Sequence, residues 1–390
     1  MFKTPTSTFK TFLWLSLAIL IFGDIMVISA AQVVGLTIGG NSFAISWKQI
    51  LVSIISVPFA ILIAQLPLKS LKWFAHRSLG IAILFMLLLI PFGRDVNGNT
   101  NWVSAGPFDF QPSEVAKVFL ILWSAYVIEN NFGDARKITI RLTIGFAMVL
   151  AIVLNGGDLG SAVVIGLVLA TLIYLAGAES KYIAGIAIAG ILGVAALVAM
   201  QPYRIARFTA FIHPFAEDVY KNAGWQPAHS LMALGSGGLF GSGIGASKQK
   251  WGNLAEAHTD FIFGVIGEEF GLLGTLLTIS AIALLVVCII KISLSAKDTF
   301  SRYLGLGIAF WIGFQSLINL ASATSLIPVV GVTLPFLSYG GTSLLALVGA
   351  LGFVAGIALR NPTVSKEFPF HLKFRFKVQS KLGAKTGAKR

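Results

Sequence analysis

The sequence contains few charged residues and a single cysteine. Only 12% of its 390 residues are charged, 56% are hydrophobic, and the mean hydropathy is +0.84. A soluble core of this size does not need so much apolar sequence, so the composition indicates a polytopic membrane protein. The lone Cys288 lies in an apolar run and excludes an intrachain disulfide. No cleavage site follows the first apolar run, and no clear internal repeat favours an inverted-repeat transporter.

Ten apolar segments, each roughly 17–25 residues long, are long enough to cross a bilayer. They lie near residues 12–34, 48–65, 78–92, 113–130, 139–155, 158–176, 181–200, 260–290, 303–324 and 343–359. We therefore expect an all-α integral membrane protein with ten transmembrane helices. One polytopic domain would cover residues 1–362.

The distribution of Lys and Arg predicts the topology. With the N-terminus inside, 21 of these residues fall on the inner side and 7 on the outer side, and Lys117 falls within a span. This bias predicts that both termini are cytoplasmic. Most of the net charge of +13 lies in a basic tail, residues 363–390, which we expect to be disordered and attracted to anionic membrane lipid. The charge therefore does not indicate nucleic-acid binding.

Two stretches between the spans are unusual. Residues 201–259 form a long segment rich in glycine, aromatic and basic residues, which we expect to be a structured extracytoplasmic loop. Residues 325–343 carry two prolines and a Gly-Gly pair. This second stretch is too apolar for open water and too broken for a helix, so we expect a re-entrant segment buried in protein.

An acidic residue stands where the long loop enters the eighth span, in HTDFIFGVIGEEFG (258–271). If this stretch is helical, Asp260 shares a face with four glycines, Gly264, Gly267, Gly271 and Gly274. A face of bare backbone lets another helix or a lipid-borne substrate approach closely. Asp260 can alternatively cap the helix together with Thr259. The adjoining polar loop favours a functional role.

Three further ionisable residues lie at the starts of spans. Glu114 and Lys117 are three residues apart on one helical face. They can form an ion pair that fixes helix packing, or they can be functional groups. Asp158 follows a tight turn and either caps the next helix or faces an external cavity.

Four cations lie in the long loop, namely Arg204, Arg207, Lys248 and Lys250. They can attract lipid headgroups, or they can build a phosphate site together with backbone N–H groups of the glycine-rich stretch. The loop histidines are too scattered to predict a metal site. An acid, these cations and a groove open to lipid together suggest group transfer from a lipid-linked donor.

Five motifs in this order resemble the SEDS family (shape, elongation, division, sporulation). They are QPSEVAK (111–117), PYRIARFTAFIHP (202–214), ALGSGGLFGSGIGASKQK (233–250), EAHTDFIFGVIGEE (256–269) and LPFLSYGGTSLL (334–345). The resemblance runs from about the first span to Pro362 and is closer to division members than to elongation members. Three departures are Asn101, where the family commonly has arginine, Gly156-Gly157, where it has Gln-Pro, and Ala255, where it has proline.

The resemblance implies a peptidoglycan polymerase that transfers glycosyl units from lipid II and releases undecaprenyl diphosphate, with inversion. Asp260 would be the catalytic base. The substrate-binding candidates are Glu114, Lys117, Asp158, Arg204, Arg207, Lys248, Lys250 and Ser338. A divalent cation, Mg²⁺ or Mn²⁺, is a plausible cofactor, although no ligand set identifies its site. The expected partners are a class B penicillin-binding protein transpeptidase and other divisome proteins at the septum. A lipid II flippase or transporter, or an elongation-type polymerase, is the alternative.

Overall fold

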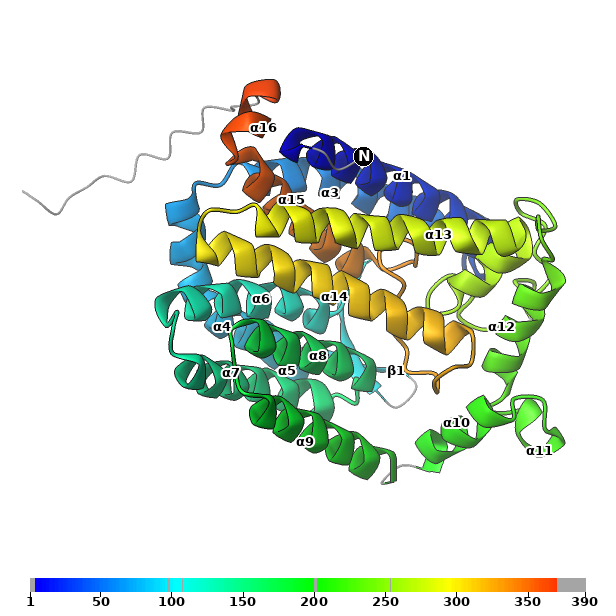
Figure 1. Ribbon diagram of the computed structural model, residues 1–390. Coiled ribbons are helices and arrows are strands. Elements are labelled where there is room, and N and C mark those ends of the chain that lie inside the picture. The colour runs from blue at the N-terminus through cyan, green and yellow to red at the C-terminus, as the bar shows by residue number, and fades with distance from the viewer. Residues whose placement is uncertain (1–3, 97–98, 107, 200–201, 253, 370–390) are drawn as a thin grey trace, which may run out of the picture.

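The computed structural model describes residues 4–96, 99–106, 108–199, 202–252 and 254–369. Long helices lie side by side, and the helices of the long loop flank one end of this bundle (Figure 1). The first helices are α1 (Pro5–Ala30), α2 (Gln32–Gly39), α3 (Ser46–Ala64), α4 (Leu68–Leu87), α5 (Leu89–Phe92), α6 (Pro112–Asn130), α7 (Ala135–Asn155), α8 (Leu159–Leu175) and α9 (Ser180–Ala199). They are followed by α10 (Pro202–Ile212), α11 (Glu217–Tyr220), α12 (Trp225–Ser236), α13 (Ile262–Leu294), α14 (Thr299–Ala323), α15 (Gly341–Leu359) and α16 (Pro362–Glu367).

Among the described residues, eight helices are long and apolar enough to cross a membrane. They are α1, α3, α4 continued by α5, α7, α9, α13, α14 and α15. Two further predicted spans coincide with α8, which is apolar but has 17 residues, and with α6, which contains Glu114, Lys117 and Glu129. The predicted membrane fold is thus confirmed, and the count of ten spans stays a prediction.

Close helix contacts depend on small residues. On α15, a β-carbon added to Gly352 would lie 2.5 Å from the carbonyl oxygen of Ala60 in α3. The backbones of these two helices are therefore in close contact, which small residues such as glycine make possible in membrane proteins. Asp24 of α1 accepts a 2.7 Å hydrogen bond from the Ser53 hydroxyl of α3, which gives this intramembrane acid a partner.

The loop between α5 and α6 forms a small antiparallel sheet that the sequence did not predict. Its strands are β1 (Gly93–Val96), β2 (Asn99–Ala105) and β3 (Phe108–Phe110), in the order β1-β2-β3. The N–H of Thr100 donates to the carbonyl of Gly156, 2.9 Å away, and ties β2 to the turn before α8.

The two irregular stretches are structured. The long loop contains α10, α11 and α12, and α12 packs on α13. The stretch before α15 has no helix or strand over 326–334, yet it buries Leu334, Phe336 and Leu337, as expected for a re-entrant segment. At the C-terminal end, residues 362–367 form α16, although we expected the tail from 363 to be disordered. The tail beyond 369 lies outside the described residues.

Helix α13 is interrupted at Gly271, whose φ of 66° and ψ of −162° are not helical. The break is filled by the segment that follows α12. In a continuous helix the amides of residues 272 and 273 would donate to the carbonyls of Glu268 and Glu269. Instead those carbonyls accept from Ser242 and Gly243, at 2.9 and 3.0 Å. The freed amides donate to the carbonyls of Gly238 and Leu239, at 2.9 and 3.2 Å.

Replacement of Gly271 by alanine tests the importance of this break. The backbone angles of Gly271 are adopted almost only by glycine, and a β-carbon would collide with the backbone of Leu239 and Gly241. We expect Gly271→Ala to lower the free energy of unfolding by roughly 1–3 kcal/mol or more. Gly166→Ala in α8 is the control, because its β-carbon would meet no atom within 4 Å. Thermal unfolding in detergent measures both, and equal melting of the two variants would contradict the prediction.

Candidate functional site

A cavity of about 830 Å³ lies where four of the predicted functional residues meet, namely Asp260, Arg207, Glu114 and Asp158. Its lining comes from α3, the small sheet, and the starts of α6 and α8, together with α9, α10 and the irregular stretches 255–260 and 327–333. Its ionisable lining residues are Lys48, Arg94, Asp109, Glu114, Asp158, Arg207, Glu256, His258, Asp260 and Tyr339. Segments more than two hundred residues apart in sequence thus share one site.

Asp260 lines this cavity, but it is not in a helix. Helix α13 begins at Ile262, its N-cap is Phe261, and no side chain caps it. The predicted capping role of Asp260 is therefore wrong. The glycine face also serves a different contact, because Gly264 packs against Ser230 of α12 and Leu254. The glycine face was expected to admit either another helix or a lipid-borne substrate. The structure shows a helix, α12, in contact with it.

The backbone around Asp260 is held by three consecutive hydrogen bonds. The donors are the Tyr339 amide to the His258 carbonyl (2.8 Å), the Ser338 hydroxyl to the Thr259 carbonyl (2.6 Å) and the Asn319 side-chain amide to the Asp260 carbonyl (2.8 Å). Ser338 is buried, and its oxygen also accepts from the Leu334 amide. It does not line the cavity, so its predicted contact with substrate is replaced by a role in positioning Asp260.

The carboxyl group of Asp260 is surrounded by protein on most sides and reaches the cavity beside Gly331. Burial, and after it the negative charges of Glu256 and Asp158, raise the pKa of Asp260 to about 7, although the positive charge of Arg207 lowers it. A group with this pKa exchanges a proton near neutral pH, as a general base must.

Asp158 has both of the roles that the sequence left open. One carboxylate oxygen accepts from the Ser161 amide at 2.9 Å and caps α8. The other accepts from the Ser113 hydroxyl at 3.1 Å and from the Gln111 side chain at 3.2 Å. The residue also lines the cavity, so it joins α6 to α8 at the edge of the site.

Glu114 and Lys117 form an ion pair of 2.8 Å with side chains only 5% and 3% exposed. Lys117 also donates to the side-chain oxygen Oε1 of Gln315 at 2.7 Å, and Glu114 accepts from the Ser343 hydroxyl at 3.1 Å. Only Glu114 of the pair lines the cavity. Lys117 thus supports Glu114 from outside the cavity lining.

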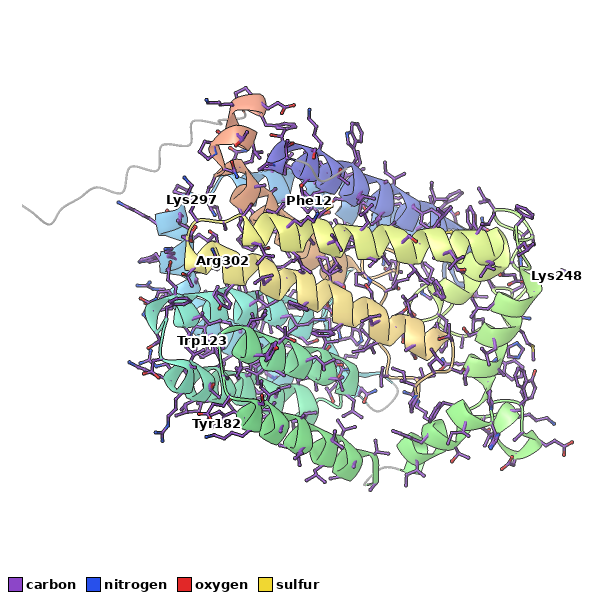
Figure 2. The ribbon with its side chains drawn as sticks, in the orientation of Figure 1. Phe12, Trp123, Tyr182, Lys248, Lys297 and Arg302 are labelled. Carbon is purple, nitrogen blue, oxygen red and sulfur yellow. The ribbon has the colours of Figure 1, made fainter. Side chains whose placement is uncertain are left out.

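The four loop cations have different surroundings. Arg207 is half-buried, lines the cavity and donates to the Val329 carbonyl at 3.4 Å. Lys250 is fully buried in an ion pair of 3.0 Å with Glu269, so its predicted contact with substrate is wrong. Lys248 is exposed but outside the cavity, at the end of the bundle opposite Lys297 and Arg302 (Figure 2).

Because Lys248 lies outside the cavity, the structure does not support the prediction that it binds substrate. The side chain of Arg204 lies outside the described part of the structure.

Several lining residues were missed as site candidates. Lys48 and Arg94 line the cavity but count in the sequence only among the seven outer-side cations, and their place at the ends of predicted spans is the available signal. Asn101 also lines the cavity, and Arg94 lies opposite its neighbour Trp102 in the sheet. The cavity thus retains an arginine near the position where the family arginine is missing. Glu256 belongs to the motif at 256–269, but the motif does not show its effect on Asp260, which depends on the turn that brings the two side chains close.

No group of three or more His, Cys, Asp or Glu side chains in the described residues has the arrangement of a metal site. The residues present therefore do not fit a cation held by protein ligands alone.

Comparisons with known proteins give one family. The profile of the family described as "Cell cycle protein", which groups FtsW, RodA and SpoVE, matches residues 10–362. A probable peptidoglycan glycosyltransferase FtsW of Aeromonas salmonicida is 34% identical over 349 residues, which are 88% of this chain and 88% of that protein. A similarly named protein of Geobacter sp. strain M18 is 37% identical over 74% of this chain and 79% of its own.

Solved structures have the same fold. RodA of Thermus thermophilus, 27% identical, covers 89% of this chain and 95% of its own with a TM-score of 0.66. A chain from a study titled "Structural coordination of polymerization and crosslinking by a peptidoglycan synthase complex" has 26% identity and a TM-score of 0.72, and the match covers 90% of this chain and 97% of that chain.

The buried ion pair gives a stability prediction. Lys117→Ala leaves the Glu114 charge buried without its partner, and we expect a loss of roughly 3–5 kcal/mol in unfolding free energy. The double change Glu114→Gln with Lys117→Met removes both charges and should recover most of that loss. Lys72→Ala is the control, because its 2.7 Å pair with Glu129 is partly exposed and should contribute less than about 1 kcal/mol. Equal melting temperatures for Lys117→Ala and Lys72→Ala would disprove the structural role.

Proposed function

Because the chain belongs to the family of FtsW, RodA and SpoVE, we propose that it is a peptidoglycan glycosyltransferase of the FtsW type. It polymerises lipid II into glycan strands in septal wall synthesis and releases undecaprenyl diphosphate. The observation that carries this proposal is the placement of Asp260, fixed by consecutive backbone hydrogen bonds beside Arg207 in one charged cavity.

Asp260 acts as the general base. It takes the proton from the acceptor sugar's 4-hydroxyl while that oxygen attacks the anomeric carbon of the donor. The bond from this carbon to the diphosphate oxygen breaks, and the electron pair leaves with undecaprenyl diphosphate. Attack opposite the leaving group inverts the anomeric centre. A correctly placed base contributes about 10²–10⁴-fold to the rate.

Cations of the cavity stabilise the departing diphosphate. Arg207 is the best supported, because it lies in the cavity and its charge acts on Asp260. Lys48 and Arg94 line the same cavity and add to its positive charge. Electrostatic stabilisation of developing charge is often the largest part of catalysis. Whether Mg²⁺ or Mn²⁺ assists is tested by assaying the purified protein with EDTA and with each added cation.

We also propose a partner and a location for this protein. We propose a complex with a class B penicillin-binding protein at the division septum, because a chain of similar fold comes from a study of a peptidoglycan synthase complex. Both termini face the cytoplasm, and residues 201–259 lie outside. The placement of Lys248 at the opposite end of the bundle from Lys297 and Arg302 supports this topology.

Asp260→Asn is the sharpest test of the base. Asn is nearly isosteric, and the three hydrogen bonds to this segment use backbone carbonyls, so the fold should persist. We expect normal melting and normal partner binding, with polymer formation reduced about 10²-fold or more. The measurement is gel-resolved polymer from labelled lipid II, with the partner present and its transpeptidase blocked. Near-normal polymer from Asp260→Asn would exclude Asp260 as the base and leave Asp158 and Glu114 as candidates.

The pH dependence tests the environment of Asp260. Only the ionised form accepts a proton, so kcat/KM, which reports the free protein, should rise with pH and reach half its maximum near pH 7. Glu256 raises the pKa of Asp260, so Glu256→Gln should move this half-maximum to lower pH. Glu217→Gln, which changes an exposed acid of α11, is the control and should leave the profile in place. If Glu256→Gln leaves the pH of the half-maximum unchanged, the rise of the rate with pH is not due to ionisation of Asp260.

The topology is tested with two exposed lysines. In a Cys288→Ala background, a membrane-impermeant thiol reagent added to intact spheroplasts should label Lys248→Cys but not Lys366→Cys. Both proteins should react after lysis, which confirms that both positions are accessible. The reverse pattern would overturn the assignment of sides.

A further inference from the structure

The segment inserted into the break of α13 exposes large apolar side chains. Leu239, Phe240, Ile244 and Trp251 are 61%, 77%, 67% and 60% exposed. A cluster of outward-facing apolar residues marks a contact with protein or membrane. Positive φ angles at Gly241, Gly243 and Gly245 produce the turns that present these side chains.

The backbone of this segment is compatible with lipid. Irregular backbone enters a bilayer only where its polar groups are paired. Four hydrogen bonds with the broken ends of α13 supply such pairing between residues 238–243 and the helix. The amides of Leu272 and Leu273 take part, and the side chains of these two residues are about half exposed on the apolar outer face of α13. The segment is therefore continuous with a surface that faces lipid.

Charged groups fix the other half of the segment. The Glu268 carboxylate accepts from the Ser247 hydroxyl at 2.6 Å and from the amides of Lys248 and Gln249 at 2.9 and 3.2 Å. Next to them, the buried pair of Lys250 with Glu269 joins the segment to α13. These contacts leave the side chain of Lys248 exposed at the end of the bundle, close in sequence to Trp251 (Figure 2).

We propose that residues 237–251 are an interfacial anchor that binds phospholipid. Phe240, Ile244 and Trp251 enter the leaflet at this end of the bundle, and Lys248 binds a headgroup phosphate. Aromatic residues and lysines with apolar stems are typical of the membrane–water boundary. The anchor thereby holds the first turns of α13, which directly follow Asp260, at a fixed depth. This inference concerns attachment to the bilayer and does not depend on glycosyl transfer.

Spin labels measure the depth of the segment. In a Cys288→Ala background, the label is attached to Phe240→Cys, with Leu277→Cys on α13 as the lipid reference and Lys221→Cys as the water reference. The protein is placed in vesicles of phosphatidylethanolamine and phosphatidylglycerol. We expect the label at 240 to resemble the one at 277, with collisions with oxygen favoured several-fold over those with a nickel chelate. A label at 240 that meets the chelate as often as the one at 221 would overturn the anchor.

Two further measurements test the chemistry of the contact. Lys248→Gln should make the label at 240 shallower in vesicles with phosphatidylglycerol, whereas Lys221→Gln should not. An unchanged depth would exclude the headgroup contact of Lys248. If the label meets oxygen poorly in lipid and is immobilised only when the penicillin-binding protein is added, the surface is a protein interface and the membrane assignment is wrong.

Discussion

The constraint that governs this molecule is the pairing of backbone polar groups away from water. A membrane interior permits helices freely, and it permits irregular chain only where protein supplies every partner. Two irregular segments have partners of this kind, and the stretch before α15 adjoins Asp260 at Gly331. The break in α13 is paired by residues 238–243, and the stretch before α15 is paired in part by Asn319, which donates to the carbonyls of both Asp260 and Val332 at 2.8 and 2.6 Å. The site is built where regular structure stops.

This arrangement explains why so many charged and polar side chains near the site are structural. Glu268 and Glu269 lie at the broken end of α13, and their carboxylates bind the loop that fills the break. Lys117 and Gln315 similarly support Glu114 from behind the cavity wall. Removal of these groups would loosen the cavity without touching a substrate, so loss of activity alone does not identify a residue that contacts substrate.

The sequence predicted what depends on local pattern and on motif. Apolar length predicted the spans, the motifs predicted the family, and Asp260, Glu114, Asp158 and Arg207 do meet in one cavity. The predictions from sequence were wrong where contacts between residues far apart in the chain determine the structure. The glycine spacing after Asp260 fits one helix, yet Gly271 breaks it, because residues 238–243 compete for the same carbonyls. Lys250 looked like an anion ligand because no local pattern shows that Glu269 and Ser29 enclose its ammonium group.

The balance of charge around Asp260 links substrate binding to basicity. Arg207 lowers the pKa of this carboxyl group, while burial, Glu256 and Asp158 raise it. In the proposed mechanism a donor diphosphate binds against Arg207, and its negative charge offsets the positive charge that Asp260 experiences. The pKa of Asp260 then rises, because Arg207 no longer favours the ionised form to the same extent. Asp260 is thus a stronger base in the complex with the donor than in the free protein. The same arginine that receives the leaving group therefore keeps the base weaker until that group is in place.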